Sequence, residues 1–236
     1  MDHLARRRAA IVAIASVVAA SCIALGFWQL ARLAERLDLN SRILARRDAT
    51  PVVIEGADTA AGSFRPATAE GTYDVAREVL VYGRSLDGEA GHHVVTPLVL
   101  GDGDAILVVR GWVPFATQSA PVAGATPPSG TVSVRGILVP DEGDGSVTPD
   151  ASGVVRTLDV AGIASTLPYD VAPHPLQLEE QTPPRSADLP VPVPLPELSE
   201  GPHLSYAIQW FSFAGVAVVG AAILVGRERR APTGAP

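Results

Sequence analysis

Two long uncharged stretches near the ends of the chain constrain its fold more than any other feature. Residues 9–30 and 206–225 contain no Asp, Glu, Lys or Arg, and neither contains proline. As α-helices they would be about 33 and 30 Å long, enough for a bilayer core of about 30 Å. A buried core helix is the alternative, but both stretches reach spanning length and carry arginines at their outer ends. The sequence therefore predicts transmembrane helices at 9–30 and 206–225.

The distribution of arginine favours one orientation of these helices without fixing it. The tails, residues 1–8 and 226–236, each hold three arginines and one acidic residue, whereas residues 31–205 hold 12 arginines and 23 acidic residues. Basic tails indicate that both termini are cytoplasmic. Five arginines that follow the first stretch closely argue against this: Arg32, Arg36, Arg42, Arg46 and Arg47.

Aromatic residues support a helical hairpin. Phe27 and Trp28 end the first stretch, and Tyr206, Trp210 and Phe211 lie at the start of the second. A hairpin of antiparallel helices brings both groups to one membrane face, as an interfacial aromatic belt requires. Small residues at four-residue spacing provide candidate contacts between the helices: Ser16, Ala20 and Ala24 in the first, and Ala217 and Ala221 in the second.

A cleaved signal peptide is the competing interpretation of the first stretch. The residues before Cys22 faintly resemble a lipoprotein cleavage site, but 22 uncharged residues exceed the usual 7–15 of a signal core. We therefore expect Cys22 to be a small apolar residue within a helix. As the single cysteine, it excludes an intramolecular disulfide and a multi-cysteine metal cluster.

The middle of the chain, 31–205, is predicted to be a mainly antiparallel β domain, a sandwich or a partial barrel. An amphipathic helix at 31–47, with Leu33, Leu37 and Leu44 on its apolar face, precedes Pro51, and Asp159 is the expected N-cap of a short helix. The Gly101–Asp104 turn joins two of the strands. A proline-rich strut at 183–202 leads to the second apolar stretch.

The predicted strands are 52–55, 64–73, 78–83, 93–100, 105–113 and 131–139. The whole chain is thus an α+β membrane protein with two antiparallel transmembrane helices flanking this domain.

Several classes of function are excluded or lack a signature. A net charge of −7 argues against nucleic acid as a partner. Dinucleotide-binding, P-loop, zinc-protease and serine-hydrolase motifs are absent from the sequence. No paired nucleophile and base can be assembled from spacing, so we predict no catalytic site and expect the protein not to be an enzyme.

His203 is the histidine with the clearest functional setting. It precedes Tyr206 and Trp210 at i+3 and i+7, which places the three on one helical face at the predicted membrane boundary. There an imidazole is able to ligate a metal or haem iron. The alternative is an interfacial histidine that hydrogen-bonds to backbone or lipid.

Two other groups carry polar chemistry in the β domain. Arg110, Gly111 and Trp112 combine a guanidinium donor fork, room for close approach and a flat aromatic surface, which suits a partner carboxylate. An internal salt bridge with a packed tryptophan is the alternative. His92 and His93 would point to opposite faces of a strand and so do not share a metal ion.

Five segments together resemble the Surfeit locus protein 1 family, membrane assembly factors for cytochrome c oxidase. The blocks follow the order and two-helix layout of that family. They are LGFWQLxR at 25–32, GTY at 71–73, GHHVVTP at 91–97, VRGWVP at 109–114 and HLxYAxxWF at 203–211. The family commonly has asparagine before the histidine and before Arg-Gly-Trp, where this chain has Pro202 and Val109.

The resemblance implies a role in maturing the haem-copper terminal oxidase. The protein would assist haem a insertion or stabilise an early assembly intermediate of the catalytic subunit. Haem a is then the candidate cofactor, with direct binding left open; His203 would be its ligand, and Trp28, Arg32, Tyr206 and Trp210 would lie at the same depth. The resemblance also implies two passes, cytoplasmic termini and residues 31–205 outside the cytoplasm. Abundant alanine and valine without lysine, and only eight residues before the first stretch, lead us to expect a bacterial plasma membrane.

Two other functions stay open at this point. The chain is alternatively a permanent accessory subunit of a respiratory complex, with its β domain docked on the complex and no role in haem delivery. A membrane-bound hydrolase is the third hypothesis, and it would require Ser, His and Asp to converge in a pocket of the β domain.

Overall fold

The computed structural model describes residues 3–230 and divides into two compact units. One unit comprises the chain up to Arg42 together with the chain from Glu197, and the other comprises Ile43–Pro196. The helices are α1 (His3–Arg47), α2 (Val160–Ala164) and α3 (His203–Arg230), with a 3₁₀ turn, η1, at Val75–Arg77. The predicted tails 1–8 and 226–236 lie partly outside the described residues; from His3 and up to Arg230 they are helical.

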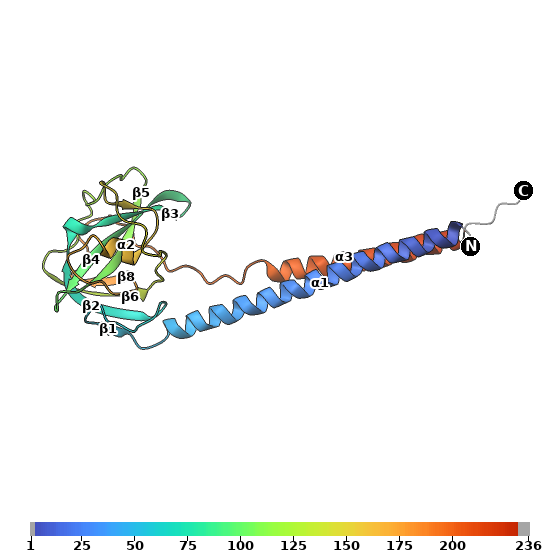
Figure 1. The fold of residues 1–236 in the computed structure, drawn as a ribbon, viewed down its shortest axis with the longest axis horizontal. Coiled ribbons are helices and arrows are strands. Elements are labelled where there is room, and N and C mark those ends of the chain that lie inside the picture. Colours follow the sequence, from blue (N-terminus) through green and yellow to red (C-terminus); the bar gives the residue numbers. More distant parts are fainter. Residues whose placement is uncertain (1–2, 231–236) are drawn as a thin grey trace, which may run out of the picture. The chain divides into compact units, whose positions relative to one another are not determined.

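The unit 43–196 contains one eight-stranded sheet that closes on itself (Figure 1). Its order is β1-β2-β6-β8-β5-β4-β3-β7, and an additional pairing of Gly71–Tyr73 in β2 with Leu98–Leu100 in β4 closes a barrel of β2, β6, β8, β5 and β4. The strands are β1 (Val52–Ile54), β2 (Pro66–Tyr73), β3 (Val79–Leu86), β4 (Glu89–Leu100), β5 (Ala105–Pro114), β6 (Thr131–Leu138), β7 (Val154–Val155) and β8 (Leu176–Thr182).

The six predicted strands are all present, with shifts of a few residues at their ends. The Gly101–Asp104 turn joins β4 to β5, and Asp159 caps α2 by accepting a hydrogen bond from the Gly162 N–H at 2.8 Å. The prediction omitted β7 and β8. Because β8 pairs with both β5 and β6, it completes the ring, and the domain is a closed barrel and not a sandwich.

Glycine allows the close strand contacts at which the barrel closes. A Cβ atom on Gly71 would lie 2.2 Å from the carbonyl oxygen of Val99, and one on Gly136 would lie 1.9 Å from that of Gln177. A register shift between Arg135 and Gly136 marks a bulge beside the second contact. Bulges bend strands and allow a sheet to curve into a barrel.

Apolar residues fill the barrel and also cover its outside. The interior cluster includes five fully buried residues, each 0% exposed: Leu98, Ile106, Val108, Leu138 and Leu176. A second cluster forms on the outer face of β3, β4 and β5, where α2 and Leu158 pack. This explains why β5 reads as a nearly continuous apolar run: both of its faces are buried.

The proline-rich segment is extended, and part of it packs on the barrel. The N–H of Val191 donates to the carbonyl of Trp112 at 2.8 Å, and the reverse hydrogen bond is 2.7 Å long. Along residues 190–196, which we call the strap, Pro192, Pro194 and Pro196 are exposed and the residues between them are half-buried. Prolines cannot donate to a further strand, so the exposed side of the strap resists edge pairing.

Helices α1 and α3 pack side by side and antiparallel (Figure 1). Ala19 and Cys22 of α1 contact Ala214 of α3, with Trp210 and Ala217 partly buried against them. Further along, the rings of Phe27 and Phe211 meet edge to face with centroids 5.5 Å apart. The buried and half-buried positions of α3 include 203, 207, 210, 214, 217 and 221, which alternate steps of four and three. This is the seam of a coiled coil.

The predicted contact stripe of α1 is wrong. Ser16, Ala20 and Ala24 are exposed, and the contacting residues of the same helix are Ala19, Cys22 and Gly26. In the same way, Leu37 and Leu44 are 42% and 50% exposed, whereas Asn40 and Ile43 are buried. Residues spaced by four drift about 40° per step around a helix with 3.6 residues per turn. Alternating steps of four and three stay on one face.

Both α1 and α3 contain a segment long and apolar enough to cross a membrane, by length and composition. Only 17% of the most apolar window of α1 and 6% of that of α3 is buried inside the protein. Large apolar side chains such as Val17, Phe27, Ile208 and Val216 are more than half exposed on these helices. The two helices are thus unlike the buried core helix considered as the alternative.

Candidate functional site

The predicted histidine site lies where α3 begins beside α1. His203 is the first residue of α3, and its Nδ1 lies 2.9 Å from Oε1 of Gln29 in α1. An amide oxygen only accepts hydrogen bonds, so Nδ1–H donates, and Nε2 takes no part in this hydrogen bond. A histidine held through one nitrogen in this way presents the other to a ligand.

The four other predicted contact residues take different positions. Trp210 lies in the α1–α3 seam, whereas Tyr206 and Trp28 are 46% and 55% exposed on the outside of the helix pair. Arg32 forms an exposed ion pair of 2.6 Å with Glu35 one turn along α1. The structure therefore brings His203 and Trp210 into the seam and leaves the others outside it. That all five contact one ligand stays a prediction.

Arg110 lies inside the β domain, where it forms the internal salt bridge that was the alternative to partner binding. Its Nη1 donates to Oε2 of Glu78 at 2.8 Å, and its Nη2 donates to the carbonyl of Ala125 at 2.6 Å. Oε1 of Glu78 accepts from the Val122 N–H at 2.8 Å, and Thr96 Oγ1 donates to Oε2 at 2.7 Å. Burial lowers the pKa of Arg110, and Glu78 opposes this shift.

Trp112 also belongs to the interior of the domain. It is 5% exposed, and its Nε1 donates to the carbonyl of Arg84 at 3.2 Å. Arg110 and Trp112 are only 6% and 5% exposed, and their binding of a partner stays a prediction. The ion pair attaches the loop after β5 to the barrel.

The two adjacent histidines of β4 have separate surroundings. His92 is buried and stacks on Phe115 with ring centroids 5.3 Å apart. His93 is half-buried on the other face, near Arg84 and Glu142. Burial lowers the pKa of both, that of His93 to about 4. Within residues 3–230 no group of three or more His, Cys, Asp or Glu side chains is arranged to hold a metal ion.

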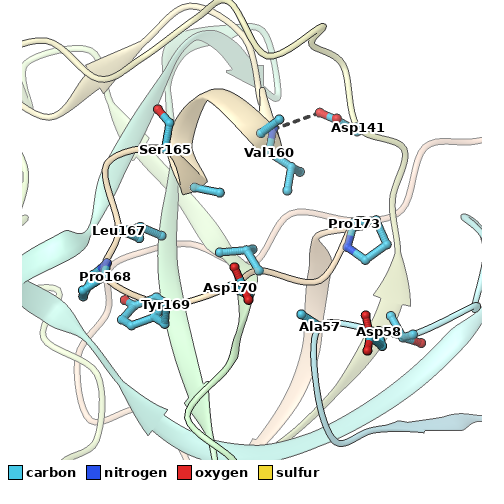
Figure 2. A pocket seen from close by; sticks show the side chains of 14 residues that line it. Ala57, Asp58, Asp141, Val160, Ser165, Leu167, Pro168, Tyr169, Asp170 and Pro173 are labelled. Carbon is cyan, nitrogen blue, oxygen red and sulfur yellow. Dashed lines mark hydrogen bonds between the residues drawn. The ribbon is translucent and has the colours of Figure 1, made fainter.

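One cavity of the β domain has a volume of about 1190 Å³, and its lining includes residues of α2, of 167–173 and of 57–59 (Figure 2). Asp141 lies at its rim and accepts a hydrogen bond from the Val160 N–H at 3.0 Å. Ser165 also lines it but donates its hydroxyl to the carbonyl of Gly162. Its described lining includes aspartates and a serine but no histidine, so this cavity does not assemble a Ser-His-Asp triad.

Sequence reasoning missed two partners that define these sites. Gln29, which holds His203, is the one amide at the end of an otherwise apolar stretch, and that isolation was an available signal. Glu78, which pairs with Arg110, has no local signal, because 32 residues separate the two and only the sheet brings them together.

Comparisons with known proteins extend over almost the whole chain. The SURF1 family matches residues 16–215. A SURF1-like protein of Mycobacterium bovis is 30% identical over 215 residues, which cover 86% of this chain and 78% of that protein. SURF1-like proteins of Monosiga brevicollis and Rickettsia felis are 29% and 25% identical and cover 81% of this chain, and 78% and 86% of their own lengths. Both the extent of the family match and this similarity to bacterial and eukaryotic relatives show that the chain belongs to the SURF1 family.

Proposed function

We propose that this protein is an assembly factor for the haem-copper terminal oxidase, cytochrome c oxidase. In this role it assists haem a insertion or stabilises an early assembly intermediate of the catalytic subunit. The observation that carries the proposal is the SURF1 family match over residues 16–215, since members of this family are known generally as oxidase assembly factors. Its partner would be the catalytic subunit or an intermediate that contains it, and the protein would not act as an enzyme.

The proposed location is a bacterial plasma membrane. Helices α1 and α3 would each cross the bilayer, with both termini in the cytoplasm and the β domain outside it. The exposed apolar side chains of both helices support this arrangement, because burying them in lipid removes a large apolar surface from water. Cys22, packed in the helix pair, would then belong to the retained first helix and not to a signal peptide.

The hydrogen bonding of His203 is that expected of a histidine that ligates haem iron. The hydrogen bond from Nδ1 to Gln29 orients the ring and leaves Nε2 without a hydrogen bond among the described residues. A second shell of this kind fixes the tautomer and raises the basicity of a metal-binding histidine. If haem a binds here, His203 would supply a coordinating nitrogen and Trp210 an apolar contact, while Trp28, Tyr206 and Arg32 lie on the outer side of the helix pair.

A permanent accessory subunit is the second candidate function. Both functions require an attached extracytoplasmic domain, and the difference lies in the partner. Association with mature oxidase in fixed stoichiometry would favour the accessory subunit. Association with precursors alone would favour the assembly factor.

Deletion of the gene tests the proposal directly. We expect the haem a absorbance of membranes to fall while the haem b and haem c bands stay normal, because insertion of haem a or the stability of its acceptor would fail. Reduced-minus-oxidised difference spectra of membranes measure this, with the wild-type gene restored as the control. An unchanged haem a band would contradict the assembly role.

A further inference from the structure

A small cavity lies between the strap and the outer face of the barrel. Its volume is about 250 Å³, and every residue that lines it belongs to the unit 43–196. The sheet side is largely apolar, and the strap contributes half-buried Val193 and Leu195. Apolar side chains from five separate segments form the wall on the sheet side: Phe64, Val81, Val109, Ile137, Val139 and Leu158. This volume suits a small molecule or one end of a larger one, since sites for drug-sized ligands occupy about 300–1,000 Å³.

Two arginines bring cationic donors into this apolar cavity. Nη2 of Arg47 donates to the carbonyl of Pro196 at 3.4 Å, and Nη2 of Arg84 forms an ion pair with Glu142. The Nε atom of each arginine is buried and has no hydrogen-bond partner among the residues that the structure describes. A buried N–H without an acceptor costs free energy, and a guanidinium offers its donors in a planar fork that matches a carboxylate.

The charges lining the cavity sum to one positive charge. Arg47 and Arg84 carry two positive charges and Glu142 one negative charge. His93 also lines the cavity, and it is neutral near pH 7 because burial lowers its pKa to about 4. The amide of Gln177 is engaged, since its Nε2 donates to the carbonyl of Val193 at 2.8 Å. A monoanion would therefore balance the site.

We infer that this cavity binds a small aliphatic carboxylate, whose carboxylate group accepts hydrogen bonds from Arg47 and Arg84 and whose chain packs against the apolar sheet wall and the strap. Three features agree on this class of ligand. The walls are largely apolar, the excess charge is a single positive one, and two guanidinium groups line the cavity. The strap is the outer wall of the cavity, and hydrogen bonds from Gln177 and Arg47 hold it in place. This site stands independently of the role in oxidase assembly.

Titration of the full chain, reconstituted in lipid nanodiscs, tests the inference. Hexanoate is the probe and hexanamide is its neutral counterpart with the same chain, with empty nanodiscs subtracted from both. We expect saturable one-to-one binding of hexanoate and at least tenfold weaker binding of hexanamide. If hexanamide binds equally well, or if hexanoate binding does not saturate, the carboxylate site is refuted.

Variants separate the cavity from general charge effects. Arg47→Gln and Arg84→Gln should each weaken hexanoate binding at least tenfold. Arg47→Gln leaves the Arg84–Glu142 ion pair intact. If Arg84→Gln unfolds, hexanoate binding by Arg47→Gln alone therefore tests the site. The matched control is Arg65→Gln, because Arg65 also has a buried, unpartnered Nε but does not line the cavity. Binding by this control should stay within twofold of wild type, and an equal loss in all three variants would refute the site.

Discussion

At the scale of single residues, the polar groups of this protein are defined by partners that are distant in sequence. His203 is oriented by Gln29, and Arg110 is held by Glu78 inside the domain. Breaking a buried ion pair by removing one partner costs about 3–5 kcal/mol, because the other charge stays buried. Arg110 is therefore part of the support that holds the loop containing Val122 and Ala125 on the barrel.

Replacement of His203 tests whether the ring binds haem. His203→Ala should abolish any haem that co-purifies with the protein. Gln29→Leu should weaken it about 10–100-fold, the usual effect of losing a second-shell partner. Absorption spectra of the purified full chain titrated with haem measure both effects. His174→Ala, a histidine outside the helix pair, is the control. Equal haem retention by His203→Ala would make His203 only an interfacial helix residue.

His93 should make the stability of the protein depend on pH. Its folded-state pKa of about 4 lies below the unfolded value of about 6.5, so the unfolded chain binds more protons between these values. The free energy of unfolding should then fall as the pH drops from about 6.5 to 4, by about 2–3 kcal/mol. Urea midpoints of wild type and His93→Gln at pH 7 and pH 4.5 check this. The variant should lose less stability over this range, and parallel losses would contradict the prediction.

At the scale of elements, spacing decides how the helices pack and glycine decides how the barrel closes. The α1–α3 seam follows steps of four and three, so each contact residue stays on the face toward the partner helix. In the barrel, β6 and β8 approach so closely at Gly136 that a side chain would meet the backbone of Gln177. A backbone carbonyl held in a ladder cannot move aside as a flexible side chain can.

A single methyl group at position 136 should therefore destabilise the barrel. Gly136→Ala should lower the free energy of unfolding by about 1–3 kcal/mol through overpacking. Gly101→Ala is the matched control, because nothing lies within 4 Å of a Cβ built there. It should change stability by no more than about 0.5 kcal/mol. Chemical denaturation of both variants measures the difference. Equal midpoints would contradict the prediction and show that the backbone of β8 shifts to accept the added methyl group.

At the scale of the whole molecule, one chain combines a helix pair with exposed apolar surface and a closed β barrel. Each unit is formed from its own segments, and the helix pair joins the two ends of the chain around the barrel domain in sequence. The barrel leaves few free strand edges, since closure pairs its strands and the strap occupies the position beside Trp112. Such a domain resists edge-to-edge association.

The proposed topology is open to a direct test by cysteine labelling. In a Cys22→Ala background, Asp102→Cys in the exposed β4–β5 turn should react with a membrane-impermeant maleimide in intact spheroplasts. Arg227→Cys, exposed near the end of α3, should react only after permeabilisation. Labelling of Arg227→Cys in intact spheroplasts, or protection of Asp102→Cys, would overturn the orientation.

The sequence by itself determined much of this protein. Uncharged length predicted the two apolar helices, and alternation with turn residues predicted six strands, because these signals are local and repeat along the chain. The ordered motifs predicted the family, which the comparisons confirm. Local pattern also suggested a face for α1, but a spacing of four selected Ser16, Ala20 and Ala24 instead of the true seam.

Only the tertiary structure decided the rest. Strand β8, LQLEEQT, has weak alternation and few β-branched residues, so its place between β5 and β6 follows from the gap that the other strands leave. The partners Gln29 and Glu78 and the cavity between Arg47 and Arg84 exist only once remote segments meet. A periodic pattern records which face of an element is buried, whereas the identity of the group that it faces depends on how the whole chain closes.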